Sequence, residues 1–499
     1  MIKALAPRIP RGFSWVWVSI VLVVGSLRAI DAREPTKARP SADAAKAKLE
    51  APADATDKAE PDASAAEAPE AAEPETPPKA STVEIFKDPR AERALTIYAP
   101  LPGSTPNNSL IRSVKAMASK QIGPDRSQIQ GYVNGYAADL TSRTNIRAVI
   151  DPPPSYPPAS AMMKAIEHAT DGLIDPILTA KQINNTDFLQ DYNQALLATL
   201  PKLLNNHLLA RIEAMIVLAQ TGSTNFIDLF IGQLKDVNQI VWVKLWAAKG
   251  LTNLVQNGQR TDELGARAIP AAEALADFLE KERKMPWPVQ VRALEALGAM
   301  RLAAVPATRD EAKMVSAAVD YLTDPQAKAE VRAQAAWAVG MLRDLQGITK
   351  FNFPLVAYHV GEVAADVGDQ VAKAYPTNRY LGEYWTGVLL YQVYPSLFGQ
   401  PGVHDSGLLN VPNRPSFVKQ VADLVQPIAK GALDLTRAPT GQQRQLEKEL
   451  SDRVAQLRTF LEKNPPRDRH LIPGGDEYPV MKGPVASEAG QEAQVTGGQ

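Results

Sequence analysis

A helical motif that occurs four times in the central part of the chain constrains its fold most. The copies are VRAQAAWAVGML (331–342), VQVRALEALGAM (289–300), VKLWAAKGLTNL (243–254) and ARIEAMIVLAQT (210–221). In every copy the first position is apolar, the fifth is Ala and the ninth is Val or Leu. A small residue one turn from a large one lets a neighbouring helix approach closely, while the larger side chain fills the remaining gap. The copies are therefore predicted to be helices that pack against neighbours on both sides.

The second position of the motif carries a base or an amide: Arg332, Gln290, Lys244 or Arg211. In two copies an Asp stands eight residues earlier, Asp324 before Arg332 and Asp236 before Lys244. An acid in the turn between two helices can hydrogen-bond with a base at the start of the second helix and satisfy the free backbone groups there. We therefore expect Arg332 to support the fold and not to form a binding site.

The motif resembles the second helix of the HEAT/armadillo-type helical repeat, which reads V-R-x-x-A-A-x-A-L-G-x-L. The resemblance covers about 185–345; it is closest in 331–342 and loosest in 210–221, where no Asp precedes the base. It implies antiparallel helix pairs stacked into an α-solenoid, whose second helices line a concave surface that binds a protein partner. Less regular helices on either side would cap the array.

The fold class predicted for the whole folded part is all-α. From about residue 104 to residue 463, apolar residues recur at three- and four-residue spacing, without the sustained alternation typical of strands. Turn signals rich in Pro and Gly separate these segments. We expect an N-terminal helical segment over 83–182, HEAT-like repeats over 183–345 and a C-terminal helical segment over 346–464.

The two ends have compositions unlike that of the folded part. Residues 1–32 begin with bases, continue with fifteen residues that are mostly apolar (13–27) and end in small residues, the layout of a signal peptide. An uncleaved membrane anchor is the alternative, although about 20 apolar residues are needed to cross a bilayer without local adjustment. Residues 33–82 are predicted to be a disordered tether, and 465–499 a disordered tail. The protein is thus expected to be secreted or periplasmic, or anchored through its leader.

Charge argues against nucleic acid as a partner. Residues 1–32 carry four bases and one acid, and residues 33–80 carry seven bases and eleven acids. The whole chain has a net charge of −1, so the remainder is neutral. A neutral folded part lacks the basic excess that binds a phosphate backbone.

The motifs of common catalytic and metal sites are missing from the sequence. There is no cysteine, the five histidines show no His-x-x-x-His spacing, and no phosphate-binding loop or nucleophile elbow occurs. His404, Asp405 and Ser406 are consecutive, and three consecutive side chains cannot easily form the hydrogen-bonded chain of a catalytic triad. We predict that the protein is not an enzyme and uses no metal or cofactor.

A binding surface on the second helices should follow positions that share one exposed helix face. Aromatic side chains among charged and amide groups are typical of binding hot spots. For the tryptophans, ordinary core packing is the alternative. The predicted partner-binding residues are Trp242, Trp246, Lys249, Arg292, Glu295, Gln334 and Trp337.

A second aromatic cluster lies in the segment 380–398. Tyr380, Tyr384, Trp385 and Tyr391 fall on one predicted helix. We expect these rings to be core residues whose phenol oxygens reach polar edges.

The function predicted from these observations is that of an exported scaffold which binds a protein partner through its solenoid surface. A second hypothesis is an exported all-α enzyme acting on glycans, with Glu213, Glu295 or Glu383 as acid and base across a cleft, about 5–10 Å apart. A purely structural component of the cell envelope is a third.

Overall fold

The computed structural model describes residues 87–151, 164–255, 261–305 and 312–480. These ranges belong to one compact unit, Lys87–Gln499. Their regular secondary structure is helical, with only two isolated bridges, Leu302–Arg343 and His470–Glu477, which confirms the all-α prediction. Within them, no helix has both the length and the apolar composition needed to cross a membrane. The predicted leader and tether lie outside the described residues.

Among the described residues, four of the first five helices, all except α6, begin at polar side-chain caps. Asp125 caps one of them by accepting a hydrogen bond from the backbone N–H of Gln128 at 3.0 Å, and Asn107 caps another in the same way. The helices are α2 (Pro89–Ala94), α3 (Asn108–Ala118), α4 (Arg126–Thr141), α5 (Arg143–Ile150) and α6 (Ala165–Gln182).

The repeated motif falls on alternate helices of the central part. Helices α8 (Leu208–Gln220), α10 (Val241–Val255), α12 (Trp287–Met300) and α14 (Ala329–Met341) contain its four copies. Helix α7 (Thr186–Thr199) precedes the first of them, and the helices between them are α9 (Ile227–Lys235), α11 (Ala268–Lys281) and α13 (Lys313–Leu322). A 3-10 turn, η3 (Thr261–Arg267), precedes α11.

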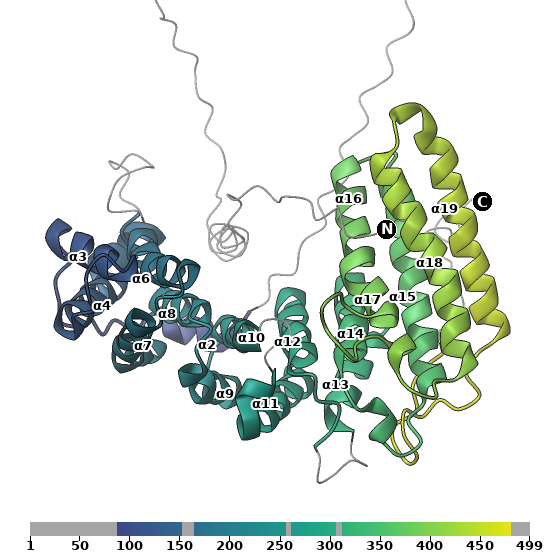
Figure 1. Cartoon of the computed structure of the whole chain (residues 1–499), viewed down its shortest axis with the longest axis horizontal. Helices are drawn as coiled ribbons and strands as arrows, with labels where there is room; N and C mark the ends of the chain where they lie inside the picture. The colour runs from purple at the N-terminus through teal and green to yellow at the C-terminus, as the bar shows by residue number, and fades with distance from the viewer. Residues whose placement is uncertain (1–86, 152–163, 256–260, 306–311, 481–499) are drawn as a thin grey trace, which may run out of the picture. The chain divides into compact units, whose positions relative to one another are not determined.

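The central helices form two rows (Figure 1). In one row α8, α10, α12 and α14 each pack on the next, and α6 extends this row by packing on α8. In the other row α9, α11 and α13 pack side by side in chain order. Each of α9, α11 and α13 also packs on the motif helix that follows it. The motif helices therefore have neighbours on both sides, as predicted.

The C-terminal helices continue from α14. They are α15 (Phe353–Ala374), α16 (Arg379–Val388), the π-helical turn η5 (Leu389–Val393), α17 (Tyr394–Phe398), α18 (Ser416–Arg437) and α19 (Thr440–Lys463). Helix α15 packs on α16, α18 and α19, while η5 and α17 pack on α14. These helices thus cover the last motif helix and end the row that it belongs to.

The fifth position of the motif lies in the core in every copy. Ala214, Ala247, Ala293 and Ala335 are all completely buried, which confirms the prediction that this position is packed. At Gly298 a Cβ atom would lie 2.7 Å from the ring of Trp337 and 2.8 Å from the Cα atom of Ala338. Helices α12 and α14 therefore approach each other almost backbone to backbone.

The predicted acid–base contact across the inter-helix turn is wrong. Asp324 and Asp236 each accept a hydrogen bond at 2.8 Å from the backbone N–H two residues further on, at Gln326 and Asn238. A short acidic side chain reaches this neighbouring N–H easily, so it forms a local turn. Arg332 donates instead to the carbonyl oxygen of Leu322 at 3.1 Å.

Bases at the second position reach the next element of the array. Lys244 lies 3.4 Å from Glu282, in the turn between α11 and α12. Arg332 lies 2.8 Å from Asp366 on α15. The prediction that Arg332 supports the fold is confirmed, because it joins the last motif helix to the C-terminal helices.

Helix α2 packs on the repeats, although its residues were assigned to the N-terminal segment. The Asp88 carboxylate accepts from the backbone N–H of Val241 at 3.2 Å. Arg90 lies 2.6 Å from Glu282, which Lys244 also contacts. These charges hold the start of the described chain at the beginning of α10.

The boundary predicted for the C-terminal tail is also wrong. Residues 465–480 form a short turn-back in which Tyr478 donates its backbone N–H to the carbonyl of Arg469 at 2.9 Å. Leu471 and Tyr478 are buried, and the Tyr478 hydroxyl donates to Asp320 at 2.9 Å. Leu471 and Tyr478 lie in a segment rich in Gly and Pro, and this composition led to the prediction of disorder. Residues 481–499 lie outside the described residues.

We expect Gly298→Ala to lower the free energy of unfolding by about 1–3 kcal/mol, because its methyl group would overlap Trp337 and the backbone of Ala338. Gly232→Ala in α9 is the matched control. A Cβ at Gly232 meets nothing within 4 Å, so the higher helix propensity of Ala should stabilise the protein by up to about 1 kcal/mol. Urea unfolding curves of the two variants test this. Equal effects of the two substitutions would contradict the close approach of α12 and α14.

Candidate partner-binding surface

Three of the predicted binding residues lie on α10. Trp242, Trp246 and Lys249 follow one another at intervals of four and three residues, which places them on one helix face. All three are partly exposed. Their partial exposure distinguishes the two tryptophans from core residues of the same helix such as Ala247, which is completely buried.

An ion network joins this face of α10 to α12. Lys249 Nζ lies 3.1 Å from Glu295 Oε1, and Arg292 contacts Glu295 Oε2. Burial by itself would raise the pKa of the Glu295 carboxyl, but the charges of Arg292 and Lys249 outweigh this effect and lower it. Glu295 is therefore held as a carboxylate between two cations. The structure thus brings together five of the seven predicted residues on two neighbouring helices.

The other two predicted residues are not on this surface. Gln334 and Trp337, on α14, are only 5% and 6% exposed, so the expectation that they form part of an exposed stripe is wrong. Helix α14 is covered by η5 and α17, and the Trp337 ring packs against Gly298. The prediction treated α14 as an open lining helix, but the C-terminal helices continue the row and cover it.

Helix α8 carries a buried acid at the position that Trp246 occupies in α10. Glu213 accepts a hydrogen bond from the Thr170 hydroxyl at 2.8 Å and is almost completely buried. Burial raises the pKa of Glu213 to about 7, and the negative charges of Asp171 and Glu167 add to the shift. At this position of the row, α8 therefore carries a carboxyl group that changes charge near neutral pH.

The three acids of the enzyme hypothesis lie in different surroundings. Glu213 is on α8 and Glu295 on α12, and α10 packs between these helices. Glu383, on α16, lies 2.9 Å from Arg379 on the protein surface. Among the described residues, no group of three or more His, Asp or Glu side chains is arranged to hold a metal ion.

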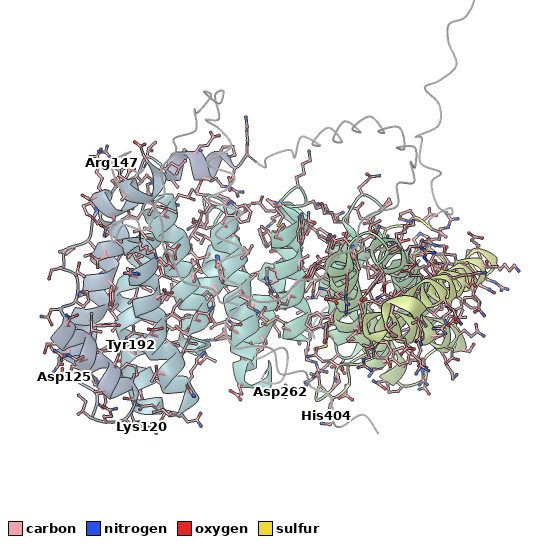
Figure 2. The ribbon with its side chains drawn as sticks, turned by 90° about the horizontal axis from the view of Figure 1, so that it is seen from above. Lys120, Asp125, Arg147, Tyr192, Asp262 and His404 are labelled. Atoms are coloured by element: carbon pink, nitrogen blue, oxygen red, sulfur yellow. The ribbon has the colours of Figure 1, made fainter. Side chains whose placement is uncertain are left out.

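The loop that contains His404, Asp405 and Ser406 packs on the ends of the motif helices. The Ser406 hydroxyl donates to the carbonyl of Val403 at 2.8 Å and accepts from the backbone N–H of Gln400 at 2.9 Å. Figure 2 shows His404 beside Asp262 at one edge of the helices. There the buried Arg301 donates to the carbonyl oxygen of His404. The serine hydroxyl thus bonds within its own loop and not with His404.

The aromatic cluster of α16 and η5 contradicts the prediction that all its rings are core. Trp385 is buried, but Tyr380, Tyr384 and Tyr391 are 84%, 43% and 70% exposed. Their spacing carried the signal, because positions 380, 384 and 391 share a helix face whereas 385 does not. Sequence reasoning treated the cluster as one group and so missed this surface.

The two glutamates of the motif helices should respond to pH in opposite ways. The pKa of Glu213 is about 7 in the folded chain, against an ordinary value of 4.5, so the folded state holds this proton to a higher pH than the unfolded state. The free energy of unfolding should then fall by about 3 kcal/mol as pH rises from about 4.5 to about 7. Glu213→Gln should remove this fall in urea titrations. An unchanged pH profile would contradict it.

Glu295→Gln is the matched variant on α12. The lowered pKa of Glu295 means that its carboxylate stabilises the fold above its unfolded-state pKa, and that this contribution is lost as pH falls through the lowered value. The variant should therefore lose about 1–3 kcal/mol at pH 7, where wild-type Glu295 is charged, and less in acid. Equal losses at pH 7 and pH 3 would contradict the role of the charge.

The sequence was compared with protein-family models and with curated proteins. No protein-family model matches the chain, and no curated protein matches its sequence. The functional conclusion therefore depends on the described geometry and on the repeat motif.

Proposed function

We propose that the chain is a HEAT-like α-solenoid that acts as a scaffold and binds a protein partner through α10 and α12. The two rows of helices and the buried alanine at the fifth position of every copy support this type of repeat. The leader supports export to the periplasm or the cell exterior, with the acidic tether as a spacer.

One observation carries the binding proposal: Trp242 and Trp246 are partly exposed one turn apart on α10, beside the Lys249–Glu295–Arg292 network. Among the described elements, α10 packs mainly on α8, α9, α12 and η3, and Trp242 and Trp246 remain partly exposed. Large aromatic side chains left partly exposed next to charged groups are typical of the centre of a protein interface.

The network also suits this surface to protein recognition. Glu295 holds Lys249 and Arg292 in place from α10 and α12, so the charged groups are ordered before a partner binds. Both signs of charge occur beside the indole rings. A surface with both signs of charge is complementary to a protein surface that also carries both signs, and less complementary to a polyanion.

The test compares partner capture by the full chain and by Trp246→Ala/Arg292→Ala. Truncating two residues at the centre of an interface should weaken binding of the captured protein at least about tenfold. The control is Leu178→Ala on α6, which removes an exposed apolar side chain away from α10 and α12.

Binding to each partner, once purified, is then measured by calorimetry. Equal affinity of the double variant and the control, or no partner from either membrane or soluble fractions, would contradict the proposal. Thermal unfolding curves of both variants are measured to check that each retains its fold.

A further inference from the structure

Helix α16 has one face that packs into the protein and one that does not. The inward face packs tightly on α15: a Cβ at Gly382 would lie 2.4 Å from the ring of Tyr375, and Trp385 is buried. Figure 1 shows α16 at one side of the C-terminal helices, with α18 and α19 on the other. The outward face carries Tyr380 and Tyr384, and the π-helical turn η5 that continues α16 carries Tyr391, the third of the exposed tyrosines described above.

The outward face has the spacing of a helix-packing seam. Positions 380, 384 and 387 are separated by four and three residues, which keeps them on one side of α16. Tyr391 follows four residues later on the wider π-helical turn η5 and is 70% exposed. The residue at 387 is Gly, and a Cβ there would meet only the edge of the Tyr391 ring, at 4.0 Å. The seam therefore consists of three large rings and one hollow.

The pattern of this seam is the same when read in either direction. In an antiparallel pair of α16–η5 segments related by a two-fold axis between positions 385 and 386, Tyr380 of one copy faces Tyr391 of the other. In the same pair each Tyr384 faces the hollow at Gly387. A parallel pair would instead place Tyr384 opposite Tyr384 and glycine opposite glycine, which leaves a gap. Self-complementarity of this kind is what a two-fold interface requires.

The polar groups at the seam fit such a pairing. Arg379 and Glu383 pair with each other at 2.9 Å, so no unpaired charge is buried between the helices. The Tyr384 hydroxyl donates to Glu330 on α14 at 3.3 Å, which orients its ring before a second copy arrives.

The exposed area of the three tyrosine rings limits the size of an interface between two copies. With the fractional exposures given above, the three rings offer roughly 400 Å² per copy, at about 150–250 Å² for each fully buried aromatic side chain. A standard stable interface buries about 800 Å² per partner. The tyrosine seam would thus be the centre of a small interface whose formation depends on protein concentration.

We propose that the protein forms a two-fold symmetric dimer through antiparallel packing of the α16 seam (Tyr380, Tyr384, Gly387 and Tyr391). The occupant of this face is a second copy of the chain. The surface is separate from the α10–α12 face, so the dimer would present two scaffold surfaces.

Sedimentation of the full chain over a range of concentrations tests the dimer. We expect a reversible monomer–dimer equilibrium, with at least a tenfold weaker association for Tyr380→Ala/Tyr391→Ala. Leu178→Ala, an exposed apolar residue on α6, should leave the equilibrium unchanged. The proposal would be overturned if the chain remained monomeric up to about 100 μM, which is well above a micromolar dissociation constant. The seam would then bind a different partner.

Cross-linking tests the antiparallel arrangement directly, because the natural chain has no cysteine. A mixture of Tyr380→Cys and Tyr391→Cys chains should form a disulfide-linked dimer under mild oxidation. Neither variant alone should do so, because like positions would lie about 16 Å apart along the helix axis. Efficient cross-linking of Tyr380→Cys alone, or none in the mixture, would overturn the antiparallel pairing.

Discussion

Close approach between neighbouring motif helices is the constraint on which the rest of the structure depends. The buried alanines at the fifth position and Gly298 leave room for one helix to lie almost against the backbone of the next. Larger side chains there would overlap their neighbours, and the row from α8 to α14 could not form at this spacing. Trp246 and Lys249 stay partly exposed on this row, and Lys249 pairs with Glu295 of the adjacent helix.

Charged side chains add a second link between successive elements. Lys244 and Arg332 occupy the same position of the motif, yet their carboxylate partners lie in the following helix pair or on α15. The network of Asp88, Arg90, Glu282 and Lys244 uses the same geometry to hold α2. These side chains are largely buried, so removing one partner would leave an unpaired charge in the interior.

The C-terminal helices decide how much of the motif row is open. Helices η5 and α17 pack on α14, where Trp337 and Gln334 are buried, whereas Trp242 and Trp246 of α10 are partly exposed. The C-terminal helices also carry an aromatic surface of their own, the exposed tyrosines of α16 and η5. The two predicted binding residues on α14 are thus buried, and exposed rings occur instead on the helices that follow it.

The sequence by itself determined the helical class, the positions of the motif helices and the buried alanines, because these depend on periodicity and side-chain size within a few turns of one helix. It also placed Lys249, Arg292 and Glu295 on one face, since that too is a local property. Only the tertiary structure decided the partner of Arg332 and the burial of Trp337 and Gln334. Each of these depends on which distant segment packs alongside, and residues far apart in the chain carry no local pattern that specifies that neighbour. Asp324 and Asp236 show the same limit at short range, because a backbone N–H two residues away competes with a base eight residues away.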